Sequence, residues 1–267
     1  MDAYAIIGNP AAHSLSPVMH EAGFDELGID AKFNALEPAE SDGAAAVGAA
    51  DTLNFSGLTV TSPFKQDVMS EVDLAESAER LGAVNTIDFT DDGPVGHNTD
   101  GPGAVEALKH HDVDLSGSAV VVGAGGAGRA LAFSLADEGM DVHIANRTES
   151  KAHDLADDVP GATGHGLDEL EELLAEASVL VNCTTVGMEQ PESTPVPKEA
   201  LHGDLAVLDA VYTPMETRLL REAKELGATT VDGAWMLLFQ GVVAFELWTG
   251  EDAPVDAMND ALRGALE

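Results

Sequence analysis

The sequence predicts an α/β protein of two domains, and three observations carry this prediction. Short apolar segments alternate with helix-like segments along the 267 residues, which is typical of mostly parallel sheets covered by helices. The apolar run 119–122 leads directly into the glycine-rich turn 123–128, and a helix-like segment follows at 129–136. The turn lies near the middle of the chain, so a first domain of about 100 residues must fold before it.

Residues 1–100 are expected to form an α/β domain with a mostly parallel sheet. Ser16 followed by Pro17 is typical of a helix start, with the serine as N-cap and the proline in the first turn. Two glycines and a proline within 98–103 favour a hinge after this domain. Strands are expected at 4–7, 32–36, 57–60 and 85–89, and helices at 16–24, 42–53 and 73–81.

Residues 101–234 are expected to form the second domain, a doubly wound sheet of the Rossmann type. Two apolar-sided helices, predicted at 234–248 and 254–266, are expected to return to the first domain, so that 235–267 completes it. The strands of the second domain are expected at 118–122, 142–145, 179–182, 206–209 and 229–231.

The glycine turn of the second domain has the composition of a pyrophosphate cradle. Backbone N–H groups at a helix N-terminus bind anions, and glycines let the backbone approach the ligand. At the end of the next strand an NAD site places Asp or Glu, whereas this chain has Arg147, which suits a 2′-phosphate. The sequence therefore predicts NADP as cofactor. The predicted contacts are Gly123, Ala124, Gly125, Gly126, Ala127, Asn146, Arg147, Thr148 and Lys151, with Arg129 nearby.

Charge and cysteine content exclude several classes of function. The chain has 12 Lys and Arg against 48 Asp and Glu, a formal net charge of −36 at pH 7. This charge excludes nucleic acid and anionic membrane surfaces as partners. Because 45% of the residues are apolar, the acidity indicates a solvated surface suited to high salt, and hence a halophilic source, rather than disorder. One cysteine leaves no intrachain disulfide, and the absence of signal-like or membrane-spanning segments predicts a cytoplasmic protein.

Lys65 stands out among the few basic residues. It follows the predicted strand 57–60, in the segment Thr61-Ser62-Pro63-Phe64-Lys65. Ligands of open α/β sheets bind at the carboxyl ends of the strands, so a lysine here can bind an anion or exchange a proton with a substrate oxygen. The alternative is a solvated surface lysine.

Motifs along nearly the whole chain resemble those of the shikimate dehydrogenase family. They are, in order, 13–20 with its two serines, 61–65, 82–86, 98–101, 182–188 and the segment around Gln240. The resemblance implies reversible oxidation of shikimate to 3-dehydroshikimate with NADP⁺, a step in chorismate and aromatic amino acid biosynthesis. The chain departs from the family at Thr59, where Asn is usual.

The resemblance also implies roles for individual residues. Lys65 is the acid/base group, and Asp100 orients it and favours its charged form. Glu76, Ala210 and Gly233 lie near the cofactor by the same analogy. Substrate contacts are implied for Ser14, Ser16, Thr61, Lys65, Asn85, Asp100, Tyr212 and Gln240, the serines and the tyrosine binding a carboxylate and the others ring hydroxyls.

Two other functions remain open at this point. One is a quinate/shikimate dehydrogenase with broader substrate or cofactor use, and the other is a non-catalytic NADP-binding regulator on the same fold. Cys183 is expected to be a packed thiol, His13 and His20 to make structural hydrogen bonds, and no metal is expected. The expected partner is a small-molecule substrate, and the protein is expected to be a monomer or homodimer.

Overall fold

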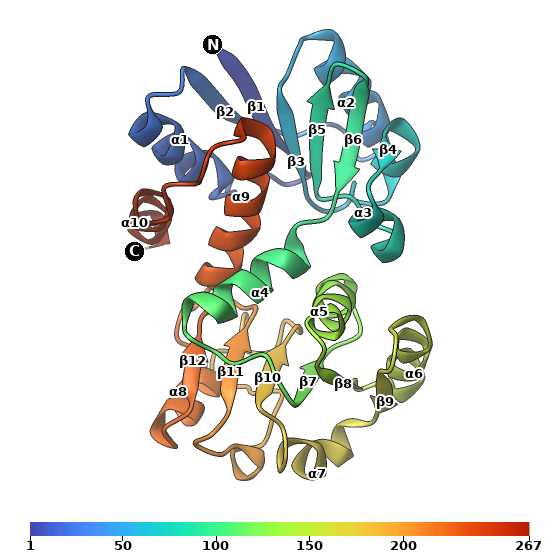
Figure 1. Ribbon diagram of the computed structural model, residues 1–267, viewed down its shortest axis with the longest axis vertical. Coiled ribbons are helices and arrows are strands. Elements are labelled where there is room, and N and C mark those ends of the chain that lie inside the picture. The colour runs from blue at the N-terminus through green and yellow to red at the C-terminus, as the bar shows by residue number, and fades with distance from the viewer. Residues whose placement is uncertain (267) are drawn as a thin grey trace. The chain divides into compact units, whose positions relative to one another are not determined.

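Two six-stranded sheets, one in each of two units, form the framework of the chain. The computed structural model describes residues 1–266 (Figure 1). Unit 1 comprises Met1–Thr99 and the segment from Gln240 onward, and unit 2 comprises Asp100–Phe239. Helix α9 (Gly233–Thr249) begins in unit 2 and continues into unit 1, where α10 (Val255–Leu266) packs against α1 (Ser16–Leu27).

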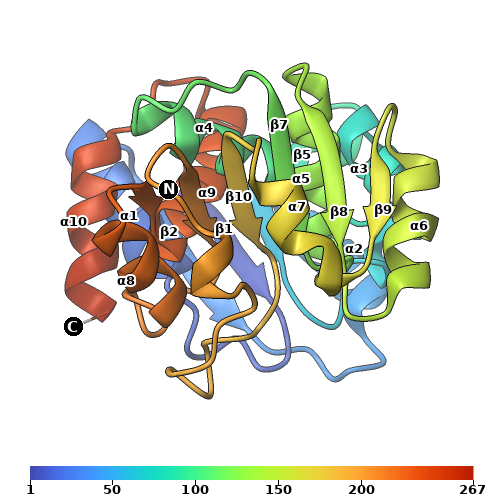
Figure 2. The ribbon, with the colours of Figure 1, turned by 90° about the horizontal axis from the view of Figure 1, so that it is seen from below.

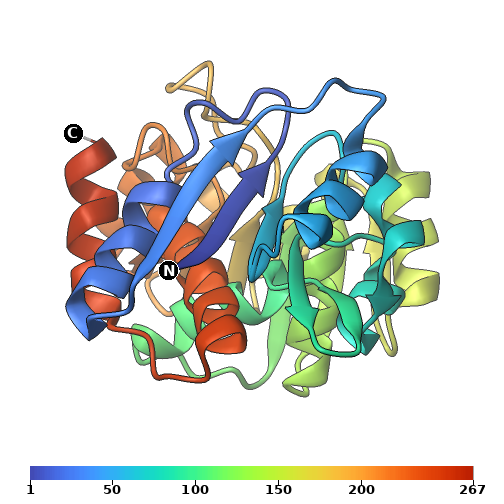
Figure 3. The same cartoon turned by 90° about the horizontal axis from the view of Figure 1, so that it is seen from above.

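The sheet of unit 1 has the order β2-β1-β3-β5-β6-β4. Strands β2, β1 and β3 pair in parallel, so the loops that follow them leave from one edge. Strands β5 and β6 form an antiparallel hairpin, and β4 pairs in parallel with β6. Figure 3 shows the blue strands β1 and β2 running side by side. The strands are β1 (Asp2–Ile7), β2 (Ala31–Leu36), β3 (Gly57–Val60), β4 (Asp73–Leu74), β5 (Thr86–Thr90) and β6 (Gly93–His97).

Each face of this sheet carries its own apolar layer. On one face, Leu58 and Ile87 pack with Phe64 and with the helical segments α2 (Gly43–Thr52) and η1 (Asp67–Glu71). On the other face, Tyr4 stacks on Phe24 of α1 and contacts Trp248 of α9. The Trp248 Nε1 donates a hydrogen bond to the Ile87 carbonyl at 3.0 Å, which fastens α9 to the centre of the sheet.

The sheet of unit 2 is parallel throughout and has the order β12-β11-β10-β7-β8-β9. In chain order this is the 3-2-1-4-5-6 arrangement of doubly wound dinucleotide-binding folds, which confirms the predicted fold class. Figure 2 shows β7, β8, β9 and β10 with α7 and α8. The strands are β7 (Ser118–Val122), β8 (Asp141–Ala145), β9 (Thr163–His165), β10 (Val179–Asn182), β11 (Ala206–Asp209) and β12 (Thr229–Val231).

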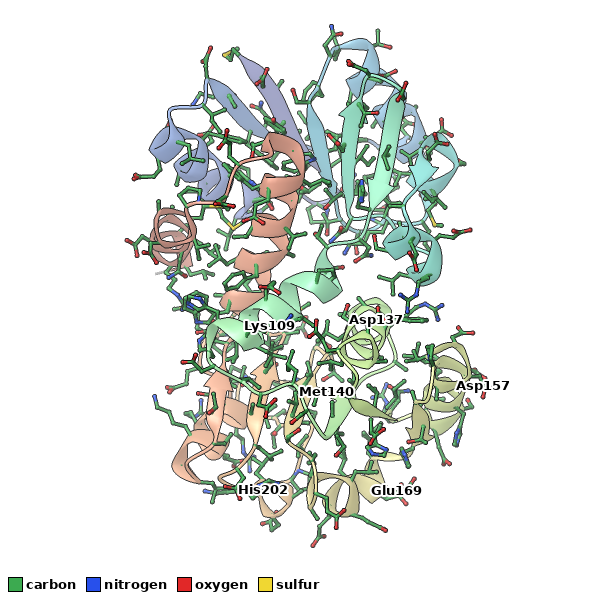
Figure 4. All side chains as sticks on the ribbon, viewed as in Figure 1. Lys109, Asp137, Met140, Asp157, Glu169 and His202 are labelled. Atoms are coloured by element: carbon green, nitrogen blue, oxygen red, sulfur yellow. The ribbon has the colours of Figure 1, made fainter. Side chains whose placement is uncertain are left out.

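Helices cover both faces of this second sheet. Apolar residues of α7 (Leu170–Leu174) and α8 (Arg218–Glu225) pack over Val120, Val122 and Leu180. Helix α5 (Gly126–Asp137) packs on β7 and β8, and α6 (Glu149–Asp158) packs on β8 and β9. Outside the core the charged side chains of Asp157 and Glu169 are both exposed; Glu169, labelled in Figure 4, accepts a hydrogen bond from Gly166 N at 3.1 Å. The remaining helical segments are α3 (Glu76–Leu81), α4 (Asp100–His110), η2 (Leu167–Glu169) and η3 (Lys198–Ala200).

The boundary between the two units, after Thr99, falls within the predicted hinge 98–103, and residues from Asp100 onward are already helical in α4. Gly101 is buried, and a Cβ there would collide with Ser134 and with the Ala130 carbonyl of α5. The glycine therefore lets α4 and α5 approach each other closely. At the far end of α4, Lys109 donates to Glu138 at 3.0 Å (Figure 4).

Three short strands have no counterpart among the predicted elements, and one predicted helix begins too early. Strand β6 contains two glycines and a proline, and β4 and β9 are too short to show alternation. Residues 73–74 form β4, so the helix predicted from residue 73 begins only at Glu76. None of the helices within residues 1–266 has both the length and the apolarity that a bilayer crossing requires.

His20 does not make the structural hydrogen bonds expected of it. Its side chain is fully buried in α1, with its ring parallel to that of Phe33 at a centroid distance of 4.6 Å. Neither ring nitrogen has a hydrogen-bond partner within residues 1–266. Burial lowers the pKa of His20 to about 3, so the imidazole is neutral and serves as an aromatic packing group.

The burial of His20 predicts that the free energy of unfolding decreases as the pH is lowered. The unfolded chain takes up a proton at His20 near pH 6.5 and the folded chain does not, so lowering the pH favours unfolding. Between pH 8 and 5.5 the wild type is expected to lose about 1.4 kcal/mol of unfolding free energy more than His20→Leu. Denaturant unfolding at constant salt measures this. Phe24→Leu, in the same cluster, controls for packing and should keep the wild-type slope; equal slopes for wild type and His20→Leu would contradict the prediction.

Candidate active site

The turn between β7 and α5 forms an anion cradle in unit 2. Gly123 has a positive φ of 112°, and Gly125 is the N-cap of α5 without a capping side chain. A Cβ at Gly125 or Gly126 would meet no atom within 4 Å, so this side of the turn is open to a ligand. At Gly128 a Cβ would overlap the Gly123 carbonyl oxygen, so only glycine lets α5 begin this close to β7. Open backbone amides at a helix N-terminus fit a pyrophosphate.

The loop after β8 lies against this turn. Asn146 Oδ1 accepts a hydrogen bond from Ala124 N at 3.3 Å, and its Nδ2 donates to the Thr148 carbonyl at 2.8 Å. Arg147 and Lys151 are exposed beside them, and neither forms an ion pair with any residue of 1–266. Two cations without a carboxylate partner, in so acidic a chain, fit the extra phosphate of NADP. Arg129, expected nearby, instead binds Asp158 at 2.6 Å.

The loop after β10 borders the same turn, and the loop after β11 lies against the start of α9. At Gly123 a Cβ would come within 3.0 Å of Thr184 and 3.2 Å of the Cys183 backbone. At Gly233 a Cβ would contact the backbone of Ala210 and Val211, so the start of α9 lies against the loop after β11. The predicted cofactor contacts Gly123 and Ala210 thus follow strands of the same sheet at the same edge, and Gly233 lies against Ala210. Tyr212 lies in the same loop as Ala210 and is 38% exposed. Burial raises the pKa of the Cys183 thiol, as expected of a packed thiol.

In unit 1 the loops after β1 and β3 are held together. Gly8 follows β1, and a Cβ there would collide with Thr61, so the glycine permits close approach. Asn9 N donates to the Ser62 carbonyl at 3.0 Å, and Thr61 N donates to the Ile7 carbonyl at 2.9 Å. The first loop leads to the two predicted serines and the second carries Lys65.

Ser16 is not the N-cap of α1, contrary to the prediction. Leu15 occupies that position, and Ser16 is the first helical residue, 4% exposed. Ser14 Oγ accepts a hydrogen bond from Ser16 N at 3.2 Å, so the earlier serine makes the local cap-like bond. The Ser14 O–H is a donor and leaves this bond unaffected, so it can point to a ligand.

The backbone of Lys65 is hydrogen-bonded to the segment that carries Asn85. Its carbonyl accepts a hydrogen bond from Val84 N at 2.8 Å. Asn85 is 3% exposed; its Oδ1 accepts from Thr99 N at 2.8 Å and its Nδ2 donates to Thr99 Oγ1 at 3.1 Å. The other predicted residues start or continue helices: exposed Glu76 opens α3, Asp100 opens α4 in unit 2, and Gln240 lies in the unit 1 part of α9.

Two acidic residues that were not predicted as site residues hold the loops of the two half-sites in place. Glu37, just after β2, accepts hydrogen bonds from Ala11 N and Ala12 N at 2.7 Å, and these bonds lower its pKa. It thereby braces the loop that leads to Ser14. The second residue is Asp209, the last residue of β11, which is fully buried. Its position at a strand end was visible in the sequence, but a single carboxylate is inconspicuous among 48.

The parallel 3-2-1-4-5-6 sheet and its open glycine turn define the class of dinucleotide-binding α/β proteins. Comparison with known families narrows this class. The model of the shikimate dehydrogenase substrate binding domain matches residues 6–87, that of shikimate / quinate 5-dehydrogenase matches 106–192, and that of the shikimate 5'-dehydrogenase C-terminal domain matches 233–263. The chain belongs to the shikimate dehydrogenase family.

Individual relatives agree over full length. The chain is 68% identical to a shikimate dehydrogenase (NADP(+)) of Haloarcula marismortui and 60% identical to one of Halobacterium salinarum, in each case over 100% of both chains. Among solved structures, the shikimate 5-dehydrogenase of Thermus thermophilus in complex with NADP(H) and shikimate has a TM-score of 0.92 at 39% identity, over 100% of both chains. A quinate dehydrogenase of Corynebacterium glutamicum in complex with NAD has a TM-score of 0.90 at 33% identity, over 98% of this chain and 99% of that one.

The packing at Gly128 predicts that this glycine supports both the fold and cofactor binding. Gly128→Ala is expected to lower the unfolding free energy by about 1–3 kcal/mol, because the new methyl overlaps a backbone oxygen. It should also weaken NADPH binding, measured by fluorescence titration.

The matched control is Gly48→Ala, an exposed position of α2 where the methyl meets nothing within 4 Å. This control should stabilise the protein by up to about 1 kcal/mol. A Gly128→Ala protein with wild-type stability and NADPH affinity would contradict the close packing of α5 on β7.

Proposed function

We propose that this chain catalyses the reversible, NADP-dependent oxidation of shikimate to 3-dehydroshikimate. The observation that carries the proposal is the position of Lys65. It is the one Lys or Arg in the three loops that follow the parallel strands β1, β2 and β3, and it is bonded to the segment of Asn85. Full-length relatives with this activity in their names support the same conclusion. The experiment is reduction of NADP⁺ followed at 340 nm with shikimate, quinate or no substrate, at high salt.

The cofactor part of the proposal rests on unit 2. Its open glycine turn would hold the pyrophosphate through the first amides of α5, and Arg147, Thr148 and Lys151 would hold the 2′-phosphate. Asn146 binds both the turn and the loop, so it sets the distance between the two phosphate sites. When bound, NADP⁺ supplies a hydride acceptor. Glu76, Ala210 and Gly233 are proposed as further cofactor contacts.

The substrate part of the proposal concerns mainly unit 1. The hydroxyls of Ser14 and Ser16, with that of Tyr212, are proposed to donate to the shikimate carboxylate. Ring hydroxyls carry both donors and acceptors, so they match the mixed set Thr61, Asn85, Asp100 and Gln240. We assign unit 1 to substrate binding and unit 2 to cofactor binding.

Proton transfer accompanies loss of the hydride. As the carbon bearing the hydroxyl becomes a carbonyl, the O–H proton passes to Lys65 Nζ, and in the reverse direction Nζ returns it to the oxygen. The Asp100 carboxylate is proposed to orient Lys65 and to favour its ammonium form. The phosphorylated cofactor and the carboxylate substrate do not cross membranes unaided, which supports the cytoplasm as the place of action. Monomer or homodimer remains a prediction.

Quinate dehydrogenase is the second candidate function, favoured by the likeness to the Corynebacterium enzyme in complex with NAD. Arg147 weighs against it, because an arginine after the second strand suits the 2′-phosphate that NAD lacks. Turnover of quinate with NAD⁺ at a rate comparable to shikimate with NADP⁺ would favour this candidate.

Loss of the Lys65 amine is expected to slow the reaction with little effect on cofactor affinity. Lys65→Ala should lower kcat by a factor of roughly 10²–10⁴, because the proton then lacks its acceptor. NADPH affinity should stay within twofold, about 0.4 kcal/mol. Lys32→Ala is the matched control, since Lys32 is an exposed lysine of unit 1 bonded to Glu21. Near-normal turnover in Lys65→Ala removes the residue from the mechanism.

Loss of the Arg147 guanidinium is expected to weaken NADP selectively. Arg147→Ala should raise the KM for NADP⁺ about tenfold or more, the usual effect of a lost charge-assisted hydrogen bond. The KM for NAD⁺ should change little, because NAD has no 2′-phosphate. Steady-state kinetics with both cofactors at fixed salt measure the ratio. Arg221→Ala, whose arginine is paired with Glu192, is the control, and equal losses for the two cofactors would contradict the assignment.

A further inference from the structure

Asp209 is a buried carboxylate that neither the cofactor contacts nor the proton transfer use. It ends β11, is fully buried, and accepts three hydrogen bonds. Oδ1 accepts from Asn182 Nδ2 at 2.8 Å and from Val211 N at 3.1 Å. Oδ2 accepts from Thr217 Oγ1 at 2.6 Å. Burial raises the pKa of Asp209, and the three hydrogen bonds act in the opposite direction by favouring the carboxylate. A carboxylate that accepts this many bonds in the interior specifies the position of every donor around it.

The three donors come from three different segments. Asn182 ends the neighbouring strand β10, Val211 lies in the loop after β11, and Thr217 is the N-cap of α8. Thr217 Oγ1 also accepts from Leu220 N at 3.3 Å, so its hydroxyl proton points to Asp209. The carboxylate therefore fixes both ends of the loop 210–217, which carries Tyr212.

The same bonds continue toward the glycine turn. Asn182 Oδ1 accepts from Thr184 N at 3.0 Å and from Thr184 Oγ1 at 2.7 Å. Thr184 lies against Gly123, where a Cβ would meet it at 3.0 Å. A continuous set of bonds thus runs from the N-terminus of α8 through Asp209 to the loop that borders the pyrophosphate cradle.

These loops belong to the second mononucleotide half of the sheet. A dinucleotide spans the point where the strand order reverses, between β7 and β10. Arg147 follows β8, so the adenosine half lies on the β7–β8–β9 side and the nicotinamide half on the β10–β11–β12 side. The bonds of Asp209 are all on the nicotinamide side.

We propose that Asp209 is a positioning residue that holds the loops 183–187 and 210–217 in place around the nicotinamide half of the cofactor site. This rests on the proposed function for the identity of the cofactor. Only a carboxylate accepts from all three neighbours, because an amide has one oxygen and its Nδ2 would have to donate to Thr217 Oγ1, which reverses that bond. Tyr212, the predicted substrate contact, is positioned through the same loop.

The test uses the full-length protein and Asp209→Asn, with Asp204→Asn as the matched control. Asp204 is exposed and precedes β11, at the opposite end of the same strand. Two ligands separate the halves of the site: NADPH fills both, and adenosine 2′,5′-bisphosphate fills the adenosine half only. Asp209→Asn should weaken NADPH at least tenfold and change bisphosphate affinity less than twofold. Amide hydrogen exchange in peptides covering 183–187 and 210–220 should become at least tenfold faster, and Asp204→Asn should match the wild type.

A pair of conservative variants keeps the proposal testable if Asp209→Asn does not fold. Thr217→Val removes one donor and should reproduce the pattern at smaller size, whereas Thr217→Ser keeps the hydroxyl and should restore wild-type values. Equal exchange and equal affinities in Thr217→Val and Thr217→Ser overturn the proposal, as does an equal loss of NADPH and bisphosphate binding in Asp209→Asn. If the wild type fails to oxidise shikimate, the proposed function falls, while the exchange and binding ratios still decide the role of Asp209.

Discussion

Close backbone approach after the first strand of each sheet is the constraint on which both candidate half-sites depend. Gly8 follows β1 and Gly123 follows β7, and in each case a Cβ would press on the loop after the adjacent parallel strand, at Thr61 or at Thr184. The carboxyl ends of parallel strands meet at one edge, so this contact brings two loops into register there. Gly128 repeats the constraint between α5 and Gly123. Polar groups can converge at these edges because no side chain fills the space between the loops.

Charge decides where an anion can approach this chain. With 48 acidic against 12 basic residues, most of the surface repels phosphate. Several bases are held by acidic neighbours, as Lys198 is by Glu225 and Arg221 by Glu192. Such exposed pairs add little to stability, and salt weakens them further. Arg147 and Lys151 are exposed and lack such partners within residues 1–266, so their charge is available to an anion beside the helix N-terminus of α5.

The sequence was most informative where burial on both faces leaves a continuous apolar run. The strands at 118–122, 179–182 and 206–209 coincide with β7, β10 and β11, because such runs have few alternative structures. Prediction failed where position depends on neighbours distant in sequence. The proline after Ser16 suggested a cap that Leu15 provides, and the ring of His20 lies among aromatic side chains instead of polar groups. Helix α4 begins inside the predicted hinge, where Gly101 packs against α5. The roles expected of the candidate site residues came from the order of family motifs along the chain, because local physical chemistry alone does not assign such roles.

Glu37 and Asp209 show why residues that support a site are hard to recognise from the sequence alone. Each is one acidic residue at a strand end, and its importance lies in the donors that the fold brings to it: two amides of the loop leading to Ser14, or three groups from three segments. Neither set of donors is adjacent in sequence. Each set also lies wholly within one unit, so each half-site is braced by its own sheet. The position of each braced loop therefore depends on hydrogen bonds within its own unit, which the sequence order of the residues does not reveal.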